Sequence, residues 1–316
     1  MDIVNKMNQL KSEIGKVMIG KNMEVELMAI SLLFNGHILL ESVPGTGKTS
    51  LAKSFSSTIG GTFSRIQFTP DVLPSDVTGI QFFNPKHQEF ELRPGPILAN
   101  IVLADEINRA TPRTQSSLLE VMEERQVTID GQTITLNEPF MVIATQNPVE
   151  SQQGTFPLPI AQMDRFFIKL NMGYPHFDEE KKIMQHHRIE KKVEKINQVF
   201  SNQDIQMMKN SLHNITISSD LEEYILHITR MTRNHPQIEL GVSPRGTIAL
   251  MKAAQGKALL DNREFVTPDD VKWVAPFVLS HRIFLTTEGI LTKSAEIIMN
   301  EILESIATPV ESGAQK

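Results

Sequence analysis

The chain contains no cysteine among its 316 residues. This absence excludes a disulfide framework, a catalytic thiol and any cysteine-ligated zinc or iron–sulfur centre, and it is typical of a reducing compartment. The nine histidines show none of the spacings of a histidine-ligated metal site, and the adjacent His186 and His187 would lie about 100° apart on a helix. We therefore expect the histidines to be solvated or packed in the core.

Long apolar runs are also missing, and no stretch approaches the roughly 20 residues that a membrane-spanning helix requires. The net charge of −6 and the pI near 5.9 leave no overall basic field to draw the chain onto nucleic acid or an acidic membrane. Residues 1–17 lack the features of an export signal and predict an amphipathic helix with Ile3, Met7, Leu10 and Ile14 on one face. We expect a cytoplasmic protein without a membrane span.

Short apolar runs alternate with helical patterns from about residue 25 to residue 170, which predicts a largely parallel sheet with helices on its faces. The expected strands are 37–40, 64–67, 101–104, 140–145 and 166–170. Two hairpins interrupt this rhythm, and they are expected over 77–92 and over 126–136, the second turning at Asp130-Gly131. The sequence thus predicts an α/β core with two hairpin insertions.

Helical patterning continues after Gly173, where glycine and proline mark the end of the last expected strand. A capping box at Ser219 and N-caps at Ser243 and Thr267, each of the latter two followed by proline, are expected to begin helices. The predicted parts are an α/β core with its N-terminal helix over 1–173, an all-helical domain over 174–308 and a flexible tail over 309–316.

Residues 42–49 match a phosphate-binding loop except at the first position, where Ser42 stands in place of glycine. Gly45 and Gly47 would let backbone amides point at phosphate oxygens, Lys48 would reach the β- and γ-phosphates, and Thr49 would ligate Mg²⁺. A surface turn is the alternative, but the strand before the loop and the helix after it favour phosphate binding. The nucleotide-binding candidates here are Ser42, Val43, Pro44, Gly45, Thr46, Gly47, Lys48, Thr49 and Ser50.

Two acids, Asp105 and Glu106, end the apolar run 101–104 and would lie beside the phosphate loop at the carboxyl edge of the sheet. There Asp105 would hold Mg²⁺ and Glu106 would activate the attacking water. A solvated acidic turn is the alternative. Asn147 ends a further apolar strand, where it would help to hold that water, although Asn147-Pro148 is by itself typical of a simple turn.

The order of these segments, continued by Met163-Asp164-Arg165-Phe166 and Ser243-Pro244-Arg245, resembles that of an AAA+ ATPase. Four segments resemble motifs of the MoxR family in their amino-acid sequence. The resemblance extends over about 17–306, nearly the whole chain. The four segments are His37-Ile38-Leu39-Leu40-Glu41, Asp105-Glu106-Ile107-Asn108-Arg109-Ala110, Ala144-Thr145-Gln146-Asn147-Pro148 and Val266-Thr267-Pro268-Asp269-Asp270-Val271. Both hairpins also have counterparts in the MoxR group and its relatives, which include the magnesium-chelatase motor subunit and the MCM helicases.

The resemblance implies a P-loop AAA+ core with a helical lid that binds ATP and Mg²⁺. It implies that Arg165 is an arginine finger acting on a neighbouring subunit, that Arg245 is the sensor 2 residue, and that Ile19 and Gly20 pack on adenine. The residues alone leave simpler roles open. Arg165 could pair with Asp164 or Glu150, Arg245 could be an exposed first-turn residue, and Met18-Ile19-Gly20 could be a break between helices. The catalytic candidates are Lys48, Glu106, Asn147 and Arg165.

At the level of function, the resemblance implies a ring of six subunits that acts as a chaperone-like motor on protein partners, among them von Willebrand factor A domain proteins. A second hypothesis is a DNA-acting motor or regulator that uses hairpin residues such as Lys86, His87 or Gln132, or a metal-chelatase-type motor subunit. The acidic pI and the few basic hairpin residues disfavour nucleic acid. A non-hydrolysing nucleotide switch is a third hypothesis, which only Ser42 suggests.

Overall fold

The computed structural model describes residues 2–147, 154–188 and 195–309. The chain forms two compact units. The α/β unit comprises Asn5–Phe166 and Leu170–Ile205, and the C-terminal unit comprises Met1–Val4, Phe167–Lys169 and Gln206–Lys316. Apart from Pro309, the expected tail lies outside the described residues, as do Pro148 and Glu150. No helix in the described ranges has the length and apolar content needed to cross a membrane.

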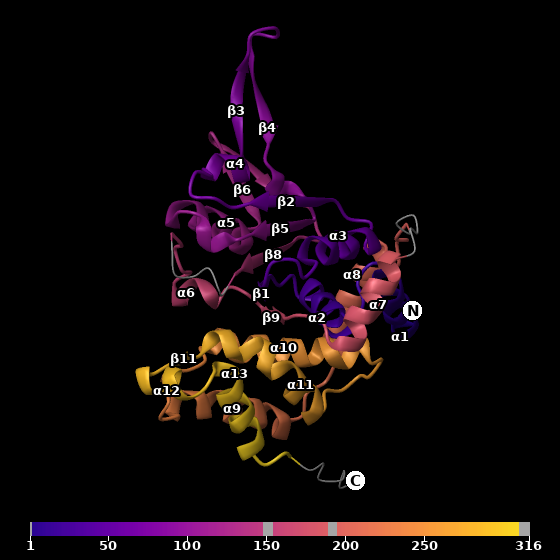
Figure 1. The fold of residues 1–316 in the computed structure, drawn as a ribbon, viewed down its shortest axis with the longest axis vertical. Coiled ribbons are helices and arrows are strands. Elements are labelled where there is room, and N and C mark those ends of the chain that lie inside the picture. Colours follow the sequence, from indigo (N-terminus) through magenta and orange to yellow (C-terminus); the bar gives the residue numbers. More distant parts are fainter. Residues whose placement is uncertain (1, 148–153, 189–194, 310–316) are drawn as a thin grey trace. The chain divides into compact units, whose positions relative to one another are not determined.

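A five-stranded sheet is the centre of the α/β unit (Figure 1). Its strands in spatial order are β2 (Phe63–Gln67), β5 (Ile101–Asp105), β8 (Met141–Gln146), β1 (Ile38–Ser42) and β9 (Ile168–Met172). The pairs β2 with β5, β5 with β8 and β8 with β1 are parallel. Every residue of β5 is buried, as expected for a central strand with helices on both faces. The five predicted strands are confirmed to within two residues at each end.

Helices cover this sheet, and the first confirms the predicted amphipathic pattern, because Ile3, Met7, Leu10 and Ile14 are all buried. The helices of this part are α1 (Ile3–Gly15), α2 (Asn22–Leu33), α3 (Lys48–Thr58), α4 (Pro74–Thr78), α5 (Pro112–Glu124), α6 (Ile160–Met163) and α7 (Phe177–Arg188), with short 3₁₀ helices η1 (Pro96–Leu98) and η2 (Ile107–Arg109). His186 and His187 lie in α7, and their side chains are outside the described set.

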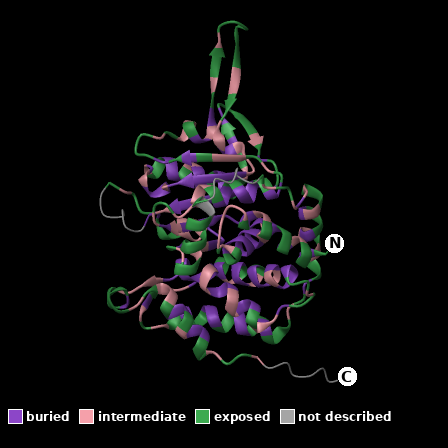
Figure 2. Ribbon diagram, turned by 45° about the vertical axis from the view of Figure 1, so that its right-hand side comes forward, coloured by how far each residue is buried: buried purple, intermediate pink, exposed green. Residues whose placement is uncertain are grey.

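Both predicted hairpins are present, formed by β3 (Gly79–Asn84) with β4 (Glu89–Pro94) and by β6 (Gln126–Ile129) with β7 (Gln132–Thr135). The β3–β4 hairpin projects from the α/β unit and is largely exposed (Figures 1 and 2). At its root Gly79 (φ +109°) and Gly95 approach so closely that a Cβ on either residue would collide with the other strand's backbone. Only glycine fits at this crossing.

The C-terminal unit is mainly helical, and its long continuous segment begins within α8 (Asn202–Ser211). Its other helices are η3 (Leu212–Asn214), α9 (Ser219–Asn234), α10 (Pro244–Leu260), α11 (Pro268–Leu279), η4 (Ser280–Arg282), α12 (Thr287–Thr292) and α13 (Ala295–Ser305). The expectation that only helices follow residue 173 was wrong, because β10 (Ile238–Leu240) pairs antiparallel with β11 (Phe284–Leu285). These strands are short and far apart in sequence, so no local turn signal announces them.

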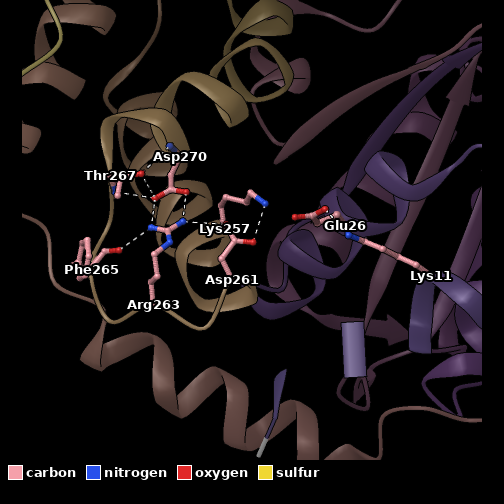
Figure 3. A network of polar contacts seen from close by, with 8 residues as sticks. All are labelled: Lys11, Glu26, Lys257, Asp261, Arg263, Phe265, Thr267 and Asp270. Atoms are coloured by element: carbon pink, nitrogen blue, oxygen red, sulfur yellow. Dashed lines mark hydrogen bonds and ion pairs between the residues drawn. The ribbon is translucent and has the colours of Figure 1, made fainter. Parts of the chain in front are cut away.

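Side-chain caps set the helix starts in this unit. The predicted N-caps Ser243 and Thr267 are confirmed, but α9 is capped by Ser218 and not by Ser219. Ser218 and Ser219 carry the same capping group, and the hydroxyl of Ser218 is the one that accepts a hydrogen bond from the Leu221 amide. Beside the Thr267 cap, Arg263 donates to the buried Asp270 carboxylate at 2.5 and 2.7 Å and to Asp261 at 3.0 Å (Figure 3). This network fixes the start of α11.

The division into units falls at residue 205, whereas the sequence placed a boundary at residue 173. Segment 195–205 is tied to the α/β unit, since the Asn197 amide donates to Glu13 at 2.9 Å and the Phe200 amide donates to the Thr58 carbonyl at 3.0 Å. Lys6 and Asp204 add an ion pair at 2.6 Å. The glycine and proline at 173–175 therefore end a strand, and the chain adds α7 to the same unit before leaving it.

Candidate functional site

The phosphate-binding loop connects β1 to α3, in the strand–loop–helix order expected from the sequence. Gly45 (φ +84°) and Gly47 (φ +86°) have left-handed backbones that other residues rarely adopt. Thr46 closes the loop by donating its hydroxyl to the Val43 carbonyl at 3.0 Å. The helix then begins at Lys48, so its unpaired amides lie at the end of the loop. This is a geometry suited to binding an anion.

Ser42, the departure from the glycine pattern, is the last residue of β1 and is only 2% exposed. Its backbone is not among those with positive φ, so the conformation does not require glycine here. The side-chain oxygen is buried and has no hydrogen-bond partner among the residues that the structure describes. Serine is therefore compatible with the path of the chain, because the two left-handed turns come later, at Gly45 and Gly47.

Asp105, at the end of β5, is 4% exposed and surrounded by donors. Thr145 donates its hydroxyl to Oδ1 at 2.6 Å, Arg65 donates to Oδ2 at 2.6 and 3.2 Å, and Lys48 Nζ lies 3.5 Å from Oδ1. Burial alone would raise the pKa of Asp105, but the hydrogen bonds from Thr145 and Arg65 and the charge of Lys48 outweigh it. The pKa is lowered as a result, and the carboxylate is anionic at neutral pH.

Glu106 has a left-handed backbone (φ 58°, ψ 49°), which is uncommon outside glycine and is typical of functional positions. The Glu106 amide donates to the Thr145 hydroxyl at 2.9 Å. Its carboxylate accepts from Gln67 at 2.9 Å, and Arg109 Nε lies 3.2 Å from the same oxygen. The turn after β5 thus aims the two consecutive acids at different sets of partners, with the Thr145 hydroxyl bonded to both residues.

The sequence analysis assigned no role to four residues of this cluster, namely Arg65, Gln67, Thr145 and Arg109, although Thr145 and Arg109 stand in segments that resemble the family. Arg65 and Gln67 are two residues apart on β2 and therefore share a face. Alternation along the strand could have grouped them, but only the strand order shows that β2 and β8 flank β5. Thr145 was hidden in the same way, as one polar residue near the end of an apolar run.

Asn147 directly follows β8 and is 3% exposed. Because Ala144 pairs with Ala104 on β5, Asn147 and Glu106 leave adjacent strands at the same edge of the sheet. The structure therefore brings Asn147 to the edge that carries the acids, as the sequence predicted.

Arg165 follows α6 and donates to the Leu119 carbonyl at 3.0 Å. The acceptor of this hydrogen bond is a backbone carbonyl of α5 and not a member of the cluster around Asp105. Arg245 lies exposed in the first turn of α10, in the C-terminal unit. The two arginines thus belong to different units of the chain.

Residues Met18 to Gly20, the expected adenine segment, lie against the phosphate loop. A Cβ placed on Gly47 would be 2.8 Å from the Met18 methyl carbon, so the Met18 side chain covers the loop at this point. Ile19 is half-buried, and Gly20 is left-handed with φ +77°. The segment therefore begins directly at the phosphate loop, although it is more than 20 residues away in sequence.

Comparisons with known proteins agree with this geometry. The model of the ATPase family associated with various cellular activities (AAA) matches residues 37–168, and that of the AAA lid domain matches residues 230–302. Together with the parallel sheet, the phosphate loop and the helical C-terminal unit, these matches define the class of the protein as an AAA+ ATPase with a lid domain.

Similar individual proteins narrow the class to one family. Chaperone MoxR1 of Mycobacterium tuberculosis is 40% identical, over 94% of this chain and 81% of its own. The uncharacterised YeaC of Bacillus subtilis is 50% identical, over 95% and 94%. A crystal structure of a proposed ATPase from Cytophaga hutchinsonii is 38% identical, covers 98% of this chain and 96% of its own, and superposes with a TM-score of 0.89. The chain belongs to the MoxR family of AAA+ ATPases.

Proposed function

We propose that the α/β unit hydrolyses ATP at the phosphate loop in an Mg²⁺-dependent reaction. The observation that carries this proposal is the convergence of Lys48, Asp105 and Glu106 at the carboxyl edge of the sheet, next to two left-handed loop glycines. The Lys48 ammonium would bind the β- and γ-phosphates, and the loop amides from Gly45 to Ser50 would hold the remaining phosphate oxygens. Ser42, Val43 and Pro44 would lead the chain into this cradle.

The oxygen ligands needed for Mg²⁺ are present in the Thr49 hydroxyl and the anionic Asp105 carboxylate, which fit a hard cation that also takes ligands from water and substrate phosphates. When bound, the metal would neutralise charge that develops on the phosphates. Glu106 would accept a proton from the attacking water, and Asn147 would help to position that water. Gln67 and Arg109 would orient the Glu106 carboxylate, since both contact its Oε2 atom.

The assignment of Glu106 is tested by Glu106→Gln, with Glu120→Gln as a matched control on an exposed position of α5. We expect Glu106→Gln to bind ATP normally while turnover falls by roughly 10² to 10⁴, because general base catalysis is lost. Glu120→Gln should keep wild-type turnover. Equal turnover in Glu106→Gln and wild type would reject the assigned base.

We further propose that the protein works as a ring, of six subunits, in which Arg165 stabilises the transition state in the neighbouring subunit and Arg245 contacts phosphate as sensor 2. The absence of an ion pair between Arg165 and the described residues around Asp105 supports an action outside its own site. Arg165→Ala should bind ATP but lose turnover by a factor on the order of 10³. The two inactive variants Arg165→Ala and Glu106→Gln should regain activity when mixed, since one neighbour supplies the arginine and the other the glutamate. Mixtures that stay inactive would place the arginine in cis.

The work of this motor, in our proposal, is chaperone-like remodelling or maturation of a protein partner. The similarity to a protein named Chaperone MoxR1 supports this proposal, and the resemblance to the family suggests partners with a von Willebrand factor A domain. Glu106→Gln in ATP should hold such a partner, so a purified von Willebrand factor A domain protein should co-elute with this variant and not with Lys48→Ala. Equal co-elution of the partner with both variants would show that partner binding does not depend on bound ATP, and would contradict the proposal.

A further inference from the structure

The segment from Met18 to Gly20 lies between two other parts of the α/β unit. At one end, the Met18 side chain contacts the phosphate loop at Gly47. At the other end, the Glu179 carboxylate of α7 lies directly against Gly20, so closely that a Cβ on Gly20 would collide with Oε1. The three residues reach at most about 7 Å when extended. The Glu179 carboxylate, which is distant in sequence, is therefore separated from the phosphate loop only by the short segment from Met18 to Gly20.

The two oxygens of Glu179 differ in their surroundings. Oε2 accepts a hydrogen bond from the His176 amide at 3.0 Å, which is the contact of a glutamate in the first turn that caps its own helix. Oε1 faces Gly20 and accepts no hydrogen bond from any residue in the described ranges. The side chain is only partly exposed. One oxygen thus anchors the carboxylate, and the other remains an acceptor beside Gly20.

A nucleotide held by its phosphates in the loop would extend its base along the Met18–Gly20 segment, if the proposed function is correct. Adenine carries an exocyclic amine at C6 that donates hydrogen bonds, whereas guanine carries an acceptor oxygen at that position. A carboxylate is an acceptor only, so it attracts the first and repels the second. We propose that Glu179 Oε1 accepts from the adenine amine and makes this site selective for adenine over 6-oxopurine nucleotides.

Helix capping alone would explain Oε2 but not the position of Oε1. The two roles are separable, because glutamine caps a helix as well as glutamate does, through its amide oxygen. Glutamine, however, can turn its amide to accept from adenine or to donate to the oxygen of guanine. Glu179→Gln should therefore preserve the start of α7 and relax the choice of base. Glu180→Gln is the matched control, since Glu180 is exposed and adjacent in sequence.

The experiment measures dissociation constants of ADP, GDP and IDP labelled at the ribose with a methylanthraniloyl group, by fluorescence, for each full-length protein. In the wild type we expect ADP to bind at least tenfold more tightly than GDP or IDP, as one hydrogen bond to a charged group implies. Glu179→Gln should bring this ratio to about threefold or less. Glu179→Ala should weaken ADP binding about tenfold and should strengthen GDP binding, because the acceptor that repels the guanine oxygen is gone. Glu180→Gln should keep the wild-type ratio.

Three results would overturn the inference. A wild type that binds ADP and GDP equally has no selectivity for Glu179 to explain. A ratio unchanged in Glu179→Gln and Glu179→Ala would make Glu179 a helix cap only, with nucleotide binding still intact. Wild-type protein that binds none of the three nucleotides would reject the proposed function itself, and the inference with it.

Discussion

Thr145 connects the two acids at the end of β5 through a single hydroxyl, and Thr145→Val removes it with little change in shape. The side chain has no exposed surface. Its hydroxyl donates to Asp105 Oδ1 at 2.6 Å and accepts from the Glu106 amide at 2.9 Å. The substitution therefore takes one donor from a buried carboxylate and leaves one backbone amide without its acceptor.

The size of the effect follows from these two contacts. A hydrogen bond to a charged group contributes about 1.5–3 kcal/mol, and an unsatisfied buried amide costs about 1–3 kcal/mol. Valine fills the space of threonine, so no cavity adds to the loss. We expect the free energy of unfolding of the α/β unit to fall by about 3 kcal/mol. Thr145→Ser keeps the hydroxyl and loses one methyl group, for a cost of about 1 kcal/mol.

Urea unfolding followed by circular dichroism gives the stability, and phosphate release gives the turnover. We expect Thr145→Val to lose turnover even under conditions in which the variant is fully folded, because the hydrogen bond to the Thr145 hydroxyl holds the left-handed Glu106 backbone. Thr145→Ser should remain active. If valine and serine at this position gave equally stable and equally active proteins, the hydroxyl would not organise the two acids, and the reasoning would be refuted.

Three further predictions concern other sites. Ser42→Ala should keep nucleotide affinity and raise stability by up to about 1 kcal/mol, because it removes a buried oxygen that no described residue hydrogen-bonds; weaker binding would contradict this. The hydrogen bond from Lys6 lowers the pKa of Asp204 from 3.8 to about 2. Because solvent screens this ion pair near the surface, we expect about 1 kcal/mol of stability, present above pH 4, to disappear as the pH falls to 2. Asp204→Asn should abolish that dependence in acid unfolding. Asp270→Asn should lower the unfolding free energy of the C-terminal unit by about 2 kcal/mol by weakening its pair with Arg263; an unchanged melting curve would contradict this.

Local patterns in the sequence predicted most of the fold. The strands follow from short apolar runs, the second hairpin from Asp130-Gly131, and the phosphate loop from its glycines and lysine. Asp130 (φ 47°) and Gly131 (φ 84°) indeed have the left-handed backbones of such a turn. Each of these signals lies within a few neighbouring residues, which is why one sequence is enough to recognise them.

Features that depend on distant residues could not be predicted in the same way. Arg65 and Thr145 join the site because their strands flank β5, and strand order is a property of the whole sheet. The β10–β11 pair and the attachment of 195–205 to Thr58 likewise join residues more than 40 positions apart. Glu179 against Gly20 is the same kind of contact. The roles proposed for Arg165 and Arg245 stay predictions.

The root of the β3–β4 hairpin and its tip differ in how far they tolerate substitution. At Gly79 and Gly95 backbone meets backbone, so these positions cannot change residue type without moving a strand. Beyond them, Phe82, Phe83 and Phe90 are exposed, and the hairpin can vary in tip sequence or length while its base stays fixed. The tip of the hairpin can thus be replaced while its root is kept. A new tip can be grafted there without redesigning the ATPase.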